Sequence, residues 1–169
     1  DVYDVLHLMD LALGLPCVKK PQMYMLGHSR GGMMTYRACA LDKRIRAAAI
    51  GAGLADAFIM YDRFHDGEYD MHQDCVELIG GTPEELPEEY KKRSAVYWAD
   101  KILPPVLICQ GTADWRVVPE QAYKMDRALT AAGKEHKLIV YEGADHSLQG
   151  TSYVKDVLDW FAAHPLPEE

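Results

Sequence analysis

The hexapeptide Gly27-His28-Ser29-Arg30-Gly31-Gly32 joins two segments of different periodicity. The apolar run at residues 23–26 is typical of a buried strand, and the periodic stretch at residues 33–41 predicts a helix. A Gly-x-Ser-x-Gly pattern at a strand-to-helix turn predicts a strained serine backbone, with small neighbours that let the strand and the helix approach closely. We therefore expect the Ser29 hydroxyl to lie above the carboxyl end of a parallel strand.

The same turn predicts a site for negative charge. The residues after Ser29 open a predicted helix, so the backbone N–H of Arg30 is placed to donate to an oxyanion that develops on a substrate. The pattern also occurs by chance in ordinary loops, which makes a purely structural turn the alternative. Its position between a strand and a helix favours the functional interpretation.

Strands and helices alternate along the rest of the chain. Apolar runs predict further strands at residues 45–52, 106–110 and 137–141, and helical periodicity predicts helices at residues 2–13, 119–132 and 154–161. Such alternation favours parallel pairing with crossover helices. We expect one α/β domain over residues 1–169, built on a parallel sheet with helices on both faces.

Residues 54–101 differ from the rest of the chain because they show no strong period. They follow the carboxyl end of a predicted strand, where lids and specificity elements are often inserted. We therefore expect an inserted lid-like or specificity segment. Within it, Thr82-Pro83-Glu84-Glu85 resembles a capping box that opens a short helix.

Two predicted strand ends supply partners for the serine. A serine hydroxyl needs a base to take its proton and a carboxylate to orient that base. Asp114 follows the strand at residues 106–110, and His146 follows the strand at residues 137–141. Because the carboxyl ends of parallel strands share one edge of the sheet, and the order Ser, Asp, His is typical of this kind of fold, we predict a catalytic triad.

Other interpretations of these polar residues remain open. Asp114 could instead cap the turn before Pro119, and His146 could be a solvated loop residue. Asp145 is a rival carboxylate, but its adjacency to His146 in the sequence favours a role in shaping the turn.

Two other histidines, His28 and His136, are expected to lie apart from the chemistry. His28 should face away from Ser29 and pack, and His136 should lie at the opposite edge of the sheet. Six metal-ligand side chains gather within the 54–101 segment, but their spacing matches no familiar ligand motif and favours a solvated acidic loop, so we expect no metal and no cofactor. These side chains are His65, Asp66, Asp70, His72, Asp74 and Cys75.

Composition narrows the classes of partner. The formal net charge of −8 argues against nucleic acid or an anionic membrane as the main partner. Four cysteines without paired spacing predict reduced thiols in a reducing compartment. No basic segment precedes an apolar stretch, and no apolar run is long enough to span a bilayer, so we expect a cytoplasmic protein.

The chain resembles the catalytic domain of the prolyl oligopeptidase family, within the α/β-hydrolase superfamily. The resemblance extends from the start of the chain to its last predicted helix. It rests on the doubled glycine of the serine motif, on the sequence segments at residues 94–102 and 111–119, and on His146.

The resemblance implies a serine-type peptidase that forms an acyl-enzyme. Ser29 would be the nucleophile, His146 the general base and then acid, and Asp114 the orienting carboxylate. Arg116 matches an arginine that hydrogen-bonds a substrate carbonyl in family members. Peptidases and carboxylesterases share this machinery, so an esterase remains the alternative.

The sequence also departs from the family, because it supplies only the later strands of the family's sheet. The loop that gives relatives a second oxyanion donor is among the parts not found. Residues 23–26 would then form an apolar sheet edge, which a second copy or a separately supplied first half could cover. A catalytically silent fragment that acts as an assembly or binding module is therefore a second hypothesis.

Overall fold

The computed structural model describes residues 2–18, 22–63 and 71–166. Its four strands form one parallel sheet in the order β1-β2-β3-β4. All four predicted strands are present, and the parallel α/β class is confirmed. The strands are β1 (Met23–His28), β2 (Ile45–Gly51), β3 (Val106–Gly111) and β4 (His136–Tyr141).

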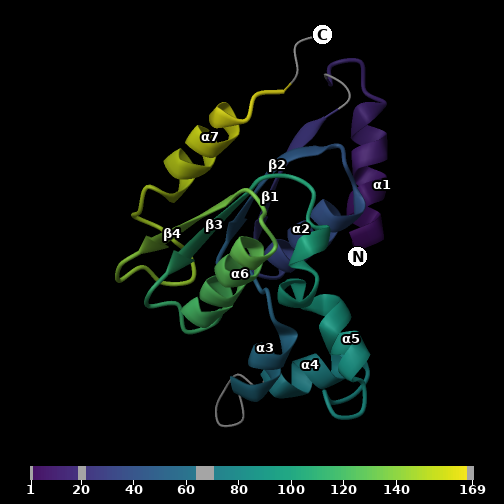
Figure 1. Ribbon diagram of the computed structural model, residues 1–169, viewed down its shortest axis with the longest axis vertical. Helices are drawn as coiled ribbons and strands as arrows, with labels where there is room; N and C mark the ends of the chain where they lie inside the picture. Colours follow the sequence, from purple (N-terminus) through teal and green to yellow (C-terminus); the bar gives the residue numbers. More distant parts are fainter. Residues whose placement is uncertain (1, 19–21, 64–70, 167–169) are drawn as a thin grey trace.

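Helices lie on both faces of the sheet (Figure 1). One face packs against α1 (Val2–Leu13), α2 (Arg30–Leu41) and α6 (Pro119–Ala131), and the other packs against α7 (Tyr153–Ala163). Each of these helices agrees with a predicted one. Together they place β2 and β3 between two layers of helices.

The two central strands are mainly apolar because both of their faces are buried. Successive side chains alternate between the faces. Those that face the α2 and α6 side are Ala48, Ile50, Val106 and Ile108. Those that face α7 are Ala49, Leu107 and Cys109.

The segment at residues 54–101 is more helical than its sequence predicts. It contains α3 (Ala57–Arg63), α4 (Met71–Ile79) and α5 (Pro87–Arg93), followed by the short 3₁₀ helices η1 (Ala95–Tyr97) and η2 (Ala99–Lys101). These three α-helices lie beyond the ends of the strands (Figure 1). They bury a small core of their own between Tyr61, Tyr90 and neighbouring apolar residues, so each needs only a short apolar stripe.

The predicted capping box forms, but α5 begins later than expected. Thr82 N–H donates to Glu85 Oε2 at 2.9 Å, and Glu85 N–H donates to Thr82 Oγ1 at 3.3 Å. Residues 83–85 form a turn, and the helix starts at Pro87, whose missing N–H suits a first helical turn.

β1 lies at one edge of the sheet that the described residues form, as predicted. Leu26 on this strand is 54% exposed. All four cysteines are unpaired, in agreement with the predicted free thiols. Among the described residues, no helix has both the length and the apolar character needed to cross a bilayer.

Candidate active site

Ser29 occupies a sharp turn between the last residue of β1 and the first residue of α2. Its backbone angles are φ 57° and ψ −124°, in a region that residues other than glycine rarely adopt. Its N–H donates to the Gly51 carbonyl of β2 at 2.9 Å, which ties the turn to the carboxyl edge of the sheet. Arg30 opens α2, so its N–H is among the helix donors that lack an intrahelical acceptor.

Two glycines allow the close approach of β1 and α2. A Cβ atom on Gly27 would lie 2.2 Å from both Gly31 O and Thr35 Oγ1, and one on Gly32 would lie 2.7 Å from the backbone of Gly53. A Cβ atom on Gly31 would meet nothing within 4 Å. The second glycine that the packing requires is therefore Gly32, whereas the sequence pattern assigns that role to Gly31.

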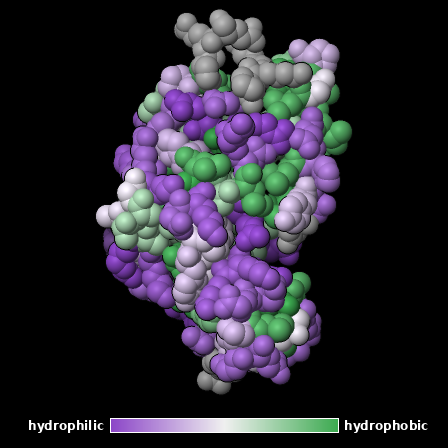
Figure 2. Space-filling view, turned by 45° about the vertical axis from the view of Figure 1, so that its right-hand side comes forward, coloured by the Kyte–Doolittle hydropathy of each residue, from purple (hydrophilic) through white to green (hydrophobic). Residues whose placement is uncertain are grey.

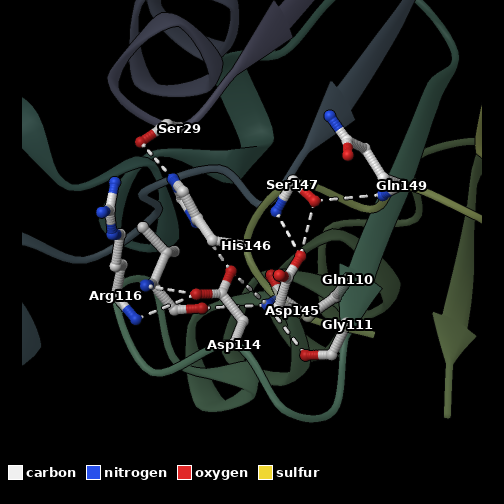
Figure 3. A network of polar contacts seen from close by, with 10 residues as sticks. Ser29, Gln110, Gly111, Asp114, Arg116, Asp145, His146, Ser147 and Gln149 are labelled. Atoms are coloured by element: carbon white, nitrogen blue, oxygen red, sulfur yellow. Dashed lines mark hydrogen bonds and ion pairs between the residues drawn. The ribbon is translucent and has the colours of Figure 1, made fainter. Parts of the chain in front are cut away.

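Ser29, His146 and Asp114 lie within hydrogen-bond distance of one another in series (Figure 3). His146 Nε2 is 3.0 Å from Ser29 Oγ, and His146 Nδ1 is 2.9 Å from Asp114 Oδ2. An ionised carboxylate can only accept, so Nδ1 carries the hydrogen and Nε2 presents its lone pair to the serine O–H. This protonation pattern lets the imidazole act as a base toward Ser29.

Asp114 is 2% exposed, and its carboxylate is held on both oxygens. Oδ1 accepts the backbone N–H groups of Arg116 and Val117, each at 2.9 Å. Oδ2 accepts from Gln110 Nε2 at 3.1 Å in addition to His146. Asp114 therefore caps its own turn, as the alternative interpretation held, and contacts the histidine as well.

Asp145 does not contact the His146 ring through any hydrogen bond recorded for the described residues. Its Oδ1 instead accepts Ser147 N–H at 2.8 Å and Ser147 O–H at 2.6 Å (Figure 3). The Ser147 hydroxyl and N–H hold the pKa of Asp145 below its usual range. Asp145 therefore shapes the turn, as expected from its position beside His146.

His28 packs, as predicted, but its packing partner belongs to the site. Its ring lies edge-on to that of His146, with centroids 5.1 Å apart, and it also lies near the Tyr153 ring at 6.3 Å. Burial, followed by the charge of His146, lowers the pKa of His28. His136 begins β4 and thus lies at the opposite, amino end of the sheet, as expected.

A cavity of about 440 Å³ opens beside Ser29 and His146. Arg116 lines it, and its side chain extends alongside His146 toward Ser29 (Figure 3). The Arg116 guanidinium also lies 5.2 Å from the centroid of the Trp115 ring. Apolar groups from the loop after β2 and from α3 and α4 form much of the wall, including Leu54, Ala57, Met60, Cys75, Leu78 and Ile79.

The remaining acidic and histidine side chains form no metal site in the part of the chain that the structure describes. No group of three or more His, Cys, Asp or Glu residues there is arranged to hold an ion. His72 instead contacts the carbonyl oxygen of Tyr61 at 3.4 Å. His65, Asp66 and Asp70 lie outside the described residues.

Gln110 is a site residue that the sequence analysis missed. It ends the predicted strand at residues 106–110, and it is fully buried there against Asp114. A polar amide at the end of an otherwise apolar buried strand is the signal that marks it, because such a group needs a buried partner.

Comparisons with known proteins agree on the family and the fold. A model of the prolyl oligopeptidase family matches residues 1–165. YtmA, an uncharacterised peptidase of Bacillus subtilis, is 29% identical over 132 residues, which cover 78% of this chain and 50% of the relative. An isoprenylcysteine alpha-carbonyl methylesterase of Arabidopsis thaliana is 26% identical over 144 residues, 75% of this chain and 33% of the relative.

A solved structure gives the same fold. The uncomplexed acylaminoacyl peptidase of Pyrococcus horikoshii matches with a TM-score of 0.84 and 20% identity, over 99% of this chain and 28% of that one. The chain thus spans half the length of the Bacillus subtilis relative and a smaller share of the other two.

Proposed function

The chain belongs to the prolyl oligopeptidase family, and from that premise we propose that it cleaves acyl bonds of peptides with Ser29 as the nucleophile. The observation that carries the proposal is the hydrogen-bonded series from Ser29 Oγ through His146 to the buried carboxylate of Asp114. The cavity beside Ser29 supplies room for a substrate at the same point.

The reaction proceeds in two halves. In the first, Ser29 Oγ attacks the substrate carbonyl carbon while His146 Nε2 takes the hydroxyl proton, and Asp114 stabilises the imidazolium that forms. The Arg30 N–H donates to the oxyanion. His146 then gives its proton to the amine. The amine departs, and the acyl group stays on Ser29. In the second half, water attacks the acyl-enzyme with His146 again as the base, and the acid is released.

The cavity favours a substrate with an apolar group on the acyl side of the scissile bond. Its apolar wall comes from α3, α4 and the loop after β2, so residues 54–101 act as the specificity segment of the proposed enzyme. Arg116, on the wall beside Ser29, is suited to hydrogen-bond a substrate carbonyl.

A carboxylesterase is the second candidate function. The match to the plant methylesterase favours it, because the same three side chains serve ester and amide hydrolysis. The two candidates differ in the leaving group that the protein accepts, since an amine must be protonated as it leaves whereas a phenolate need not be.

Matched substrates separate these functions. We expect the chain to hydrolyse a p-nitroanilide and a p-nitrophenyl ester that carry the same apolar acyl group, and we expect Ser29→Ala to lose both activities. A small acetyl group in place of the apolar acyl group is the control for the cavity and should react more slowly. Hydrolysis of the ester alone would favour the esterase, and full activity in Ser29→Ala would refute the proposed nucleophile.

A further inference from the structure

We propose that Gln110 is a positioning residue that orients the Asp114 carboxylate toward His146. This inference rests on the proposed function, because it concerns how that same site works. It starts from a polar side chain that is fully buried at the carboxyl end of an apolar strand.

Three oxygen atoms surround one terminal atom of the Gln110 amide. They are Val117 O at 2.9 Å, Asp114 Oδ2 at 3.1 Å and Gly111 O at 3.2 Å. All three can only accept a hydrogen bond, so the atom among them must be the nitrogen. The reverse orientation would place the amide oxygen against three acceptors.

The other end of the same amide shows that this orientation is costly to keep. Gln110 Oε1 is buried and has no hydrogen-bond partner among the described residues. A buried acceptor without a partner destabilises the folded state. The contacts that Nε2 makes with Asp114 and with the turn at Val117 offset this cost, and an apolar side chain of similar size would avoid it.

The contact with Asp114 affects the histidine through a shared atom. Gln110 Nε2 and His146 Nδ1 both donate to Oδ2 of Asp114, and Gln110 approaches from the side away from the imidazole (Figure 3). The amide therefore fixes the direction in which Oδ2 presents its remaining lone pair. That direction sets how well the carboxylate stabilises the imidazolium during the reaction.

A matched pair of variants separates this role from plain structural support. Gln121 is also fully buried, and its amide hydrogen-bonds to the backbone of Ala55 and Asp56 instead of Asp114. We would compare Gln110→Met with Gln121→Met, since each replaces a buried amide by an apolar side chain of similar length. Thermal unfolding of both variants measures the structural cost.

Two readouts follow the Asp114–His146 pair. In Gln110→Met the rate at which a fluorophosphonate labels Ser29 should fall about tenfold or more, because the Asp114 carboxylate is then free to turn away from the ring. The pKa of His146, measured by NMR titration of its ring, should fall, because a carboxylate that turns away stabilises the imidazolium less. Gln121→Met should change neither.

The other charged or titratable groups near His146 are the same in both variants. They include His28 from β1 and Asp145 and Arg116 from the adjoining loops. A difference between the two variants therefore reports on Gln110. An unchanged His146 pKa in folded Gln110→Met, or an equal shift in Gln121→Met, would overturn the inference.

A second variant keeps the test decisive if Gln110→Met does not fold. Gln110→Leu also removes the amide donor but fills the site with a shorter apolar side chain, so the pKa of His146 should fall and labelling should slow. A folded Gln110→Leu protein with the wild-type pKa of His146 would equally overturn the inference. If the wild-type chain is not labelled at all, the proposed function fails, whereas a His146 pKa that depends on Gln110 still supports the positioning role.

Discussion

At the scale of single residues, the Asp114 carboxylate is surrounded by donors on both of its oxygens. In Asp114→Asn the amide oxygen would face the two backbone N–H groups, so the NH₂ group would face Gln110 and His146. His146 would then carry its hydrogen on Nε2 and could not accept the Ser29 proton. We expect kcat to fall by about 10⁴, the loss known for this change in a serine protease.

Steady-state kinetics on a chromogenic ester measures this loss, and Ser29→Ala gives the background rate. Thermal unfolding of the variant checks that it remains folded. A reduction of less than tenfold in a folded Asp114→Asn protein would mean that this carboxylate does not set the tautomer of His146.

His28 gives the molecule a pH-dependent stability. Burial lowers its pKa in the folded state below the ordinary value of 6.5, so the unfolded chain binds the proton more readily. The free energy of unfolding is therefore highest above pH 6.5 and falls as the pH drops through the interval down to the lowered pKa. In His28→Gln this part of the pH dependence should be missing.

Urea denaturation at a series of pH values from 5 to 8 gives the slope for both proteins. The wild-type chain should lose more stability than His28→Gln between neutral and acid pH. Parallel curves for the two proteins would show that His28 titrates alike in the folded and unfolded states.

At the scale of elements, the turn from β1 to α2 depends on Gly27 much more than on Gly31. Alanine at Gly27 would place a methyl group against the backbone of α2 and against Thr35, so we expect it to destabilise the fold by about 3 kcal/mol, the upper part of the range for overpacking. Alanine at Gly31 has open space and lies within a helix, where it should be neutral or stabilise by up to about 1 kcal/mol.

Chemical denaturation of Gly27→Ala and Gly31→Ala compares the two positions directly, because both substitutions add one methyl group to the same turn. Equal losses of stability would mean that the motif needs small residues in general and not one close contact.

The elements that support the site could be predicted because their sequences are locally consistent. β2 and β3 carry mainly apolar side chains on both faces of the sheet, and α6 has a proline at its start. The helices α3 and α4 could not be predicted, since their apolar residues pack mainly on one another and the stripe on each is short. Likewise, the placement of His28 beside His146 depends on how separate strands and their loops meet, which the pattern of a single strand does not reveal.

At the scale of the whole molecule, apolar surface gathers on the side of α1 and β1. Figure 2 turns the α1 side forward and shows apolar patches there among polar residues. Tyr3, Leu8 and Leu11 of α1 are exposed, as is Leu26 on the edge strand β1. An edge strand with an exposed apolar residue is prone to pair with another strand.

We therefore expect the chain to self-associate as its concentration rises, and we expect Leu26→Lys to weaken this association by placing a charge on the edge. Light scattering over a concentration series measures the effect, and Leu158→Lys on the outer side of α7, where Leu158 is also exposed, is the matched control. A wild-type chain that stays monomeric throughout the series would contradict the prediction.

The reactivity of one hydroxyl group tests the proposed chemistry most directly. The folded chain would be treated with a fluorophosphonate, and mass spectrometry would locate the adduct. We predict a single adduct on Ser29, its absence in Ser29→Ala, and much slower labelling in His146→Ala. A folded wild-type chain without an adduct on Ser29, or labelling at an equal rate in His146→Ala, would contradict the proposal that His146 activates this serine.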